Sequence, residues 1–227
     1  LFLLEFFRYK IDGHEDVEKL TKLPILGDVA VANENSKSRG EIVVHENVNN
    51  MMEEIFRSMR TNLQFMLKEG EKTIMFTSST SGEGKTFCAA NLAICFALLG
   101  KKVILIGLDI RKPRLADLFR IDNKHTGITN LLVKNNVTWE DIQKQILPSE
   151  VNANTDLLMA GPVPPNPAEL LNRPTLDKIF EILREHYDYI LVDTAPVGLV
   201  TDTLHIARVA NITAYVTRAD YTPKENI

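Results

Sequence analysis

Apolar residues follow two different spacings along most of this chain. Short, almost continuous apolar runs predict buried strands at 73–77, 103–106, 156–159, 189–192 and 212–217. Apolar positions at helical spacing predict helices at 51–68, 85–99, 114–119, 127–134, 138–146, 174–186 and 202–209. Continuous apolar strands that alternate with helices are typical of a parallel sheet covered on both faces. The pattern therefore predicts an α/β fold with a doubly wound, mostly parallel sheet.

The first fifty residues depart from this pattern. Residues 1–7 are strongly apolar and lead directly into Arg8, Tyr9 and Lys10. A bilayer takes about 20 residues to span, so this stretch is too short to cross one by itself, but it suits the cytoplasmic end of a membrane helix that begins upstream. An amphipathic segment docked on the domain is an equally open alternative. Residues 28–50 are polar and aperiodic, which predicts a linker.

These features predict three regions in the chain. We expect a juxtamembrane segment over 1–27, a polar linker over 28–50 and a folded α/β domain over 51–227. Because the chain starts at Leu1 rather than Met, we expect a fragment of a longer protein. We also expect the last helix and strand of the domain to lie beyond Ile227.

Composition narrows the class further. The 227 residues are 44% hydrophobic and 25% charged, which is typical of a globular domain and excludes disordered, collagen-like and disulfide-scaffold classes. A net charge of -4 argues against a nucleic-acid partner, which needs a basic face. Cys88 and Cys95 fall in one apolar predicted helix and are expected in the core. The five histidines are scattered, so a structural zinc site is not expected.

One polar segment carries a phosphate-binding pattern. It reads Ser79-Thr80-Ser81-Gly82-Glu83-Gly84-Lys85-Thr86 and lies between the strand at 73–77 and the helix at 85–99. It matches the P-loop except at the first position, where Ser79 replaces glycine. Its backbone amides would face phosphate oxygens, Lys85 would reach the β- and γ-phosphates, and the Thr86 hydroxyl would bind Mg²⁺. The alternative is a Gly/Ser turn that happens to precede a lysine.

Two aspartates follow predicted strands. Asp193 ends the run at 189–192, and the carboxyl end of a parallel strand opens onto the ligand crevice, where a P-loop needs an acid for its metal. A loop aspartate that caps a turn is the alternative. Asp109 follows the strand at 103–106 and would contact the metal or accept a proton from an attacking hydroxyl. Its alternative role is that of a structural partner for Arg111.

In this combination and order, the motifs resemble the cytoplasmic kinase domain of bacterial tyrosine autokinases, which act in capsule and exopolysaccharide assembly. The resemblance covers nearly the whole chain and rests on 79–86, Asp109-x-Arg111, Asp193, the proline-rich stretch 161–171, residues 15–27 and Glu54-x-x-Arg57-x-x-Arg60. It implies a P-loop kinase domain over 51–227 that uses ATP and Mg²⁺. It further implies Lys85, Asp109 and Asp193 as catalytic residues, Thr86, Asp109 and Asp193 at the metal, and Arg111 beside the nucleotide.

The resemblance also implies partners. Glu54, Arg57 and Arg60 would join copies into a ring in which one subunit phosphorylates the tyrosine tail of its neighbour. A polysaccharide export machinery, a tyrosine phosphatase and the cytoplasmic face of the inner membrane are the other expected partners. From the residues alone, the three charged side chains lie along one helix face, and a solvated surface with internal ion pairs is the better explanation; the resemblance favours the interface instead.

Two departures from the family pattern bear on activity. Gly107 stands where the family usually has the first aspartate of Asp-x-Asp-x-Arg, so Asp109 would act without that partner. The tyrosines are not clustered, so the acceptor tail is expected beyond Ile227; they are Tyr9, Tyr187, Tyr189, Tyr215 and Tyr221.

Two alternatives to a kinase remain open from the sequence. A partition or septum-placement ATPase would share the fold, but those proteins carry a signature lysine at the position of Thr80. A nucleotide-binding scaffold of an export complex, with weak or no kinase activity, is kept open by Gly107.

Overall fold

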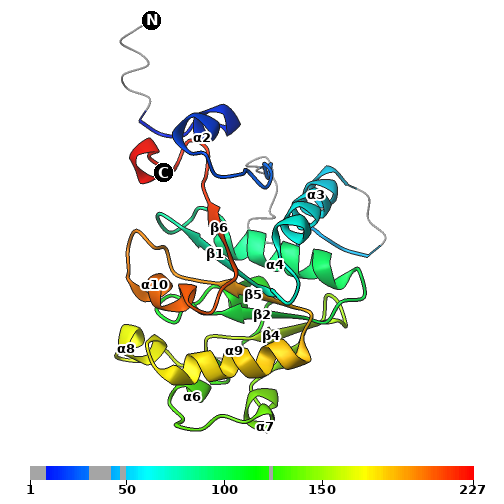
Figure 1. Ribbon diagram of the computed structural model, residues 1–227, viewed down its shortest axis with the longest axis vertical. Coiled ribbons are helices and arrows are strands. Elements are labelled where there is room, and N and C mark those ends of the chain that lie inside the picture. Colours follow the sequence, from blue (N-terminus) through cyan, green and yellow to red (C-terminus); the bar gives the residue numbers. More distant parts are fainter. Residues whose placement is uncertain (1–8, 31–41, 47–49, 123–124) are drawn as a thin grey trace, which may run out of the picture.

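The computed structural model describes residues 9–30, 42–46, 50–122 and 125–227, and its centre is one six-stranded sheet (Figure 1). The strands lie in the order β3-β4-β2-β5-β1-β6. Their bounds are β1 Thr73–Ser78, β2 Val103–Gly107, β3 Leu147–Pro148, β4 Thr155–Leu158, β5 Tyr189–Asp193 and β6 Ile212–Val216. Neighbouring strands are parallel, except that β3 pairs with β4 antiparallel. The doubly wound, mostly parallel α/β fold is confirmed.

Helices cover both faces of this sheet. On one face lie α3 (Met51–Met66), α4 (Lys85–Ala97) and α5 (Leu115–Leu118). On the other lie α6 (Ile128–Leu132), α7 (Trp139–Gln143), α8 (Pro167–Leu171), α9 (Pro174–His186) and α10 (Asp202–Ala207). The alternation of strand side chains produces the two layers: Ile104 and Ile106 pack on the α9 side, whereas Val103 and Leu105 pack on the α4 side. Figure 1 shows α4 and α9 on opposite sides of the sheet.

Four short elements have no counterpart in the sequence prediction: α2 (His14–Leu20), α8, β3 and the 3₁₀ turn Lys224–Asn226. No residue of α2 is buried, so its sequence does not show the spacing of apolar residues from which a helix is predicted. α8 has five residues and begins at Pro167, where proline is tolerated because the first amides of a helix have no acceptor inside the helix. None of the described helices is long and apolar enough to cross a membrane. The apolar stretch at 1–7, predicted as the end of a membrane helix, lies outside the described residues.

α4 is buried on almost every side, between α3 and the sheet. The prediction that both cysteines lie in the core is confirmed, because Cys88 and Cys95 are buried and free. Burial raises the pKa of the Cys88 thiol to about 12, and it also raises the pKa of Cys95. Both thiols therefore stay protonated at neutral pH and act as small apolar side chains.

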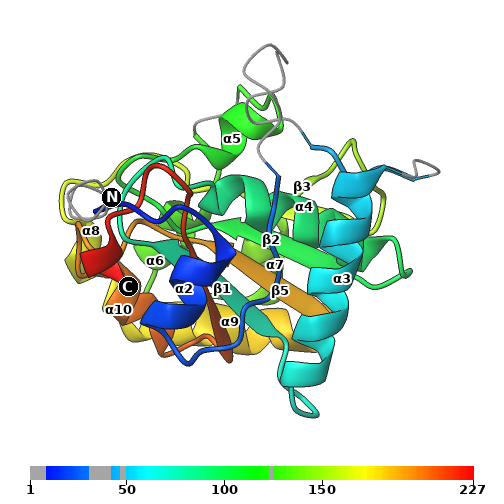
Figure 2. The ribbon, with the colours of Figure 1, turned by 90° about the horizontal axis from the view of Figure 1, so that it is seen from above.

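The two ends of the described chain pair with each other. The Ile11 amide donates to the Thr222 carbonyl at 2.9 Å, and the Asp220 amide donates to the Ile11 carbonyl at 2.8 Å. Lys10 and Pro223 form an antiparallel bridge, and Lys224 Nζ lies 2.9 Å from Asp16 Oδ2. Figures 1 and 2 accordingly show α2 beside the C-terminal end of the chain. The N-terminal arm is thus held by the segment that follows β6.

Part of the segment predicted as a polar linker is packed on α4. The buried side chain of Asn91 accepts hydrogen bonds from the Val43 amide at 2.7 Å and the Val44 amide at 3.1 Å. Its own Nδ2 donates to the Phe87 carbonyl within α4 at 2.9 Å. The Val44 side chain is fully buried among apolar side chains. One asparagine therefore satisfies two neighbouring amides of an extended segment that has no sheet partner there.

We expect Asn91→Ala to lower the free energy of unfolding by about 1–3 kcal/mol, because two amides lose their acceptor. Urea denaturation would measure this loss. Amide hydrogen exchange offers an internal comparison, since Val43 and Val44 should exchange much faster in the variant while Ile104 in β2 keeps its protection. Unchanged exchange at Val43 and Val44 would contradict this role of Asn91.

Candidate nucleotide-binding site

The phosphate loop spans the gap between the end of β1 at Ser78 and the start of α4 at Lys85. Gly82 and Gly84 have φ angles of +90° and +102°, which side-chain-bearing residues rarely adopt. Gly84 directly precedes the first turn of α4. The first amides of a helix have no acceptor inside the helix and attract anions. The loop therefore has the backbone shape that phosphate binding requires.

Glu83 fixes the loop from within. Its side chain is almost fully buried, and its Oε1 accepts from the Ser79 hydroxyl at 2.8 Å. Its Oε2 accepts from the Thr80 amide at 2.8 Å, and the Thr222 hydroxyl also donates to Oε1. The Glu83 carboxylate is thus occupied by hydrogen bonds within the loop and from the chain after β6. Only its backbone amide remains for the predicted contact with the nucleotide.

Thr86 and Asp193 meet at the start of α4. The Thr86 hydroxyl donates to Asp193 Oδ2 at 2.7 Å, which joins residues 107 positions apart. Asp193 is the last residue of β5, and Lys85 beside Thr86 is 7% exposed. The other carboxylate oxygen, Asp193 Oδ1, is buried and has no hydrogen-bond partner among the described residues. Burial raises the pKa of Asp193 to about 7, against the opposing effects of Thr86 and Lys85.

This arrangement fits a magnesium ion. Mg²⁺ prefers oxygen ligands and usually takes one or two from the protein together with substrate phosphates. A threonine hydroxyl and a buried carboxylate with one open oxygen supply such a set, and a cation would remove the cost of burying the charge. Among the described residues, there is no cluster of three or more His, Cys, Asp or Glu that would hold a metal without the substrate.

Asp109 lies at the neighbouring strand end. Its Oδ1 accepts from the Lys112 amide at 3.0 Å and from the Arg111 amide at 3.3 Å, which closes a tight turn after β2. The negative charge of Asp109 contributes to the raised pKa of Asp193. The two carboxylates thus lie close enough to interact, as their positions after adjacent parallel strands predict.

The Arg111 side chain has a partner within the chain. Its guanidinium forms a two-bond ion pair with Asp202, with Nε at 2.6 Å from Oδ2 and Nη2 at 3.0 Å from Oδ1. Asp202 begins α10 and is 1% exposed. The pair joins the loop after β2 to the chain after β5. The sequence did not predict this role of Asp202, because an aspartate at the start of a helix indicates only a favourable interaction with the helix dipole. The position of Arg111 beside the nucleotide stays a prediction.

The phosphate loop also has an external support, residues 218–222, here called the clamp segment. Arg218 Nη1 donates to the Gly82 carbonyl at 3.0 Å, and the Tyr221 hydroxyl donates to the Ser81 carbonyl at 2.8 Å. Thr222, fully buried, donates to Glu83 from the same segment. These residues were missed in the sequence, because no local pattern connects them to a loop about 140 positions earlier.

Gly198, in the loop after β5, permits that loop to approach the phosphate loop closely. The Val197 amide donates to the Ser78 carbonyl at 2.9 Å. A Cβ on Gly198 would lie 2.4 Å from the Ser79 carbonyl oxygen, so only glycine fits at this position. The loop after β5 therefore packs directly on the phosphate loop, beside Asp193.

The three residues predicted at an oligomer interface lie on α3, which packs against α4. Glu54 is exposed, and Arg57 pairs with it at 3.3 Å. Arg57 also pairs with Glu53, which is fully buried. Arg60 Nη1 donates to the Cys95 carbonyl on α4 at 2.8 Å. Arg57 and Arg60 thus have intramolecular partners, and Glu54 is the most exposed of the three.

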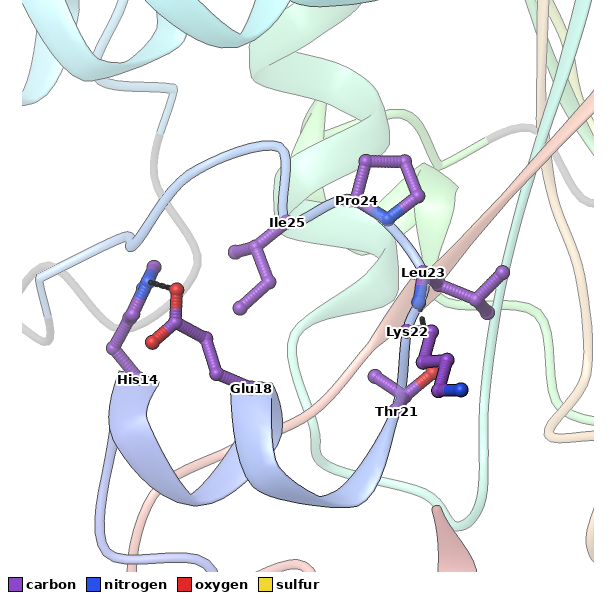
Figure 3. Close-up of a pocket in the computed structure, with 7 residues that line it drawn as sticks. All are labelled: His14, Glu18, Thr21, Lys22, Leu23, Pro24 and Ile25. Atoms are coloured by element: carbon purple, nitrogen blue, oxygen red, sulfur yellow. Dashed lines mark hydrogen bonds and ion pairs between the residues drawn. The ribbon is translucent and has the colours of Figure 1, made fainter.

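A separate hollow of about 500 Å³ lies in the N-terminal arm (Figure 3). His14 on α2 contacts Glu18 at 3.2 Å and Asp28 at 2.7 Å. The hydrogen bond to Asp28 raises the pKa of His14, and Glu18 adds to the effect. Figure 3 shows the Ile25 side chain directed toward α2 across this hollow. The hollow shares no residue with the phosphate loop.

The titration of Asp193 has a measurable consequence for stability. Its pKa is about 7 in the folded chain, against an ordinary value of 3.8, so the folded state binds more protons between these values. The free energy of unfolding should therefore fall as pH rises, by roughly 2–3 kcal/mol between pH 5 and pH 8. In Asp193→Asn, the free energy of unfolding measured by urea denaturation should not show this decrease with pH.

Asp141→Asn provides the control. Its hydrogen bond from Lys134 lowers the pKa of Asp141, so this partly exposed carboxyl is ionised throughout the pH range. The variant should keep the slope of the unaltered chain. Equal slopes for Asp193→Asn and the unaltered chain would contradict the raised pKa.

Several known proteins are similar to this chain. A family model described as an AAA domain matches residues 71–213. The putative tyrosine-protein kinase CapB of Staphylococcus aureus is 35% identical over 187 residues, which are 82% of this chain and 79% of CapB. The solved tyrosine kinase domain of BceF superposes with a TM-score of 0.80 at 32% identity, covering 96% of this chain and 90% of that one.

A more distant likeness concerns the fold alone. The septum site-determining protein MinD of Pyrococcus horikoshii superposes with a TM-score of 0.54 at 22% identity. The match covers 65% of this chain and 58% of MinD. It supports the doubly wound architecture and says nothing further about activity.

Proposed function

This chain belongs to the family of bacterial tyrosine kinases, and from that premise we propose that it transfers the γ-phosphoryl group of ATP to tyrosine hydroxyls of neighbouring copies. The membership rests on the match to CapB over 82% of the chain. The chain is thus a P-loop protein-tyrosine kinase of the type found in capsule and exopolysaccharide biosynthesis.

One observation carries the proposal: the Thr86–Asp193 pair with its open, buried Asp193 Oδ1, next to Lys85. Phosphoryl transfer asks the protein mainly to position groups and to neutralise charge. Lys85 and the amides of residues 81–86 hold the phosphates, and Thr86 and Asp193 hold Mg²⁺. The metal, when bound, supplies positive charge to the phosphate oxygens.

Asp109 is the candidate to accept the proton of the attacking tyrosine hydroxyl or to join the metal. It lies at the end of the neighbouring strand, and its charge influences Asp193. Gly107, paired in register with Asp193, carries no carboxylate to share this work. A Cβ at position 107 would lie 3.5 Å from the Ala160 amide and from Leu115, in ordinary contact. Asp109 therefore acts here without the first aspartate of the family pattern.

We further propose an oligomer joined through the exposed edge of α3, where Glu54 and Arg57 lie. Each copy in a ring would offer a tyrosine-bearing tail, beyond Ile227, to the next. An anchor upstream of residue 9 would hold this assembly at the cytoplasmic face of the inner membrane, beside an export machinery. A tyrosine phosphatase would reverse the modification.

We expect Lys85→Met to reduce phosphotyrosine formation at least about a hundredfold, because the positive charge at the transferred phosphoryl group is lost. Incubation with ATP and Mg²⁺ followed by phosphotyrosine detection would measure it. Lys178→Met, on the exposed side of α9, is the matched control and should retain full signal. Equal signal from Lys85→Met and the unaltered chain would refute the kinase mechanism.

For the oligomer, we expect Glu54→Arg to lower the mass measured by light scattering, because it reverses the charge of an exposed interface residue. This variant is preferable to changes at Arg57 or Arg60, which would also remove the contact with the buried Glu53 or the contact with the Cys95 carbonyl. Glu181→Arg is the control, since Glu181 is about equally exposed and also has an ion-pair partner three positions away. A mass that neither variant changes would exclude α3 as the interface.

A further inference from the structure

Tyr221 holds the phosphate loop from outside. Its hydroxyl donates to the Ser81 carbonyl at 2.8 Å, and a Cβ on Gly82 would lie 3.2 Å from the same hydroxyl. The Arg218 guanidinium lies 5.3 Å from the Tyr221 ring centroid and donates to the Gly82 carbonyl. Two side chains of one short turn thus fix two consecutive carbonyls of the loop.

These contacts lie on the carbonyl side of the loop backbone. Phosphate is bound by the amide groups, which point the opposite way from the neighbouring carbonyls. Tyr221 therefore lies outside the loop and does not point at the phosphates bound by its own subunit. The residue is 40% exposed, so a second molecule can approach it.

We propose that Tyr221 is a phosphorylation site of this kinase, modified by another copy of the chain, and that its phosphate releases the Ser81 and Gly82 carbonyls of the phosphate loop from Tyr221 and Arg218. This inference rests on the proposed function. In the reaction, the Tyr221 oxygen forms a bond to the γ-phosphorus of ATP while the bond to the β-phosphate oxygen breaks. ADP leaves with that electron pair, and the phenolic proton passes to a carboxylate of the donor subunit and then to water.

Phosphorylation of Tyr221 weakens both contacts, the one from Tyr221 to Ser81 and the one from Arg218 to Gly82. The hydroxyl proton that was donated to Ser81 is gone, and a group of charge about −1.5 to −2 faces a carbonyl oxygen instead. Arg218 is already beside the ring, and a charge-assisted bond to phosphate is stronger than its bond to the neutral Gly82 carbonyl. Arg218 therefore turns to the phosphate, and the Ser81 and Gly82 carbonyls lose their two side-chain donors.

The rest of the segment stays attached when Tyr221 moves. Thr222 remains bonded to Glu83 and to the Ile11 amide, and the Asp220 amide remains bonded to the Ile11 carbonyl. Asp220 has a φ of +59°, so the turn that carries Tyr221 already stores backbone strain. Release is thus local to the Tyr221 side chain and Arg218, and it loosens the site without unfolding it.

The first experiment locates the phosphate. The full-length protein is treated with a phosphatase, incubated with ATP and Mg²⁺, and mapped by mass spectrometry, with Tyr221→Phe and Tyr9→Phe in parallel. Tyr9 is 64% exposed and tests whether exposure alone selects the site. Phosphate on Tyr221, with a rate that rises with protein concentration, is expected. Phosphotyrosine elsewhere and none at Tyr221 overturns the inference alone, whereas no phosphotyrosine at any position also refutes the proposed function.

The second experiment measures release. Binding of N-methylanthraniloyl-ADP with Mg²⁺ is titrated before and after incubation with ATP. We expect the Kd of the unaltered chain and of Tyr9→Phe to rise three- to tenfold after phosphorylation and to recover after phosphatase treatment. Tyr221→Phe should bind two- to fivefold more weakly from the start and not change. An unchanged Kd in a chain phosphorylated at Tyr221 overturns the release.

Discussion

The parallel pairing of β1 between β5 and β6 is the constraint on which the rest of the molecule depends. The register sets Phe76 beside Asp193 on one side and Ser78 beside Val216 on the other. Because these strands run in the same direction, their carboxyl ends meet at one edge of the sheet. That edge collects the phosphate loop, the end of β5 and the clamp segment, and every contact of the nucleotide site follows from it.

Three buried carboxylates at this edge differ in the hydrogen bonds that they accept. Glu83 accepts three hydrogen bonds and serves the loop's own shape. Asp202 pairs with Arg111 through two bonds and joins two neighbouring loops. Asp193 accepts one bond from Thr86 and keeps a buried oxygen without a partner among the described residues. Burying a carboxylate that has only one hydrogen bond is costly, and its pKa is raised to about 7. Of the three carboxylates, Asp193 is therefore the one that a bound cation would stabilise most.

The phosphate loop is also a meeting point for distant parts of the chain. The clamp segment supports its carbonyls, Gly198 packs against Ser79, and the N-terminal arm holds the clamp segment through Ile11. The arm, the clamp segment and the loop therefore form one continuous series of contacts. A change at the chain's N-terminal end has a direct structural connection to the loop that carries Lys85.

The sequence by itself determined the fold class and predicted which residues gather at the end of the phosphate loop. Apolar runs and helical spacing predicted every strand longer than two residues, and the P-loop pattern with Asp193 after a strand predicted the Thr86–Asp193 meeting. These signals are local, because period, turn residues and strand ends are written in consecutive positions. Only the tertiary structure decided that Arg111 pairs with Asp202, that Asn91 docks residues 43–44 and that Tyr221 and Arg218 support the loop. Those partners lie 47 or more positions apart, and a single exposed or buried polar residue carries no mark of the distant group that satisfies it.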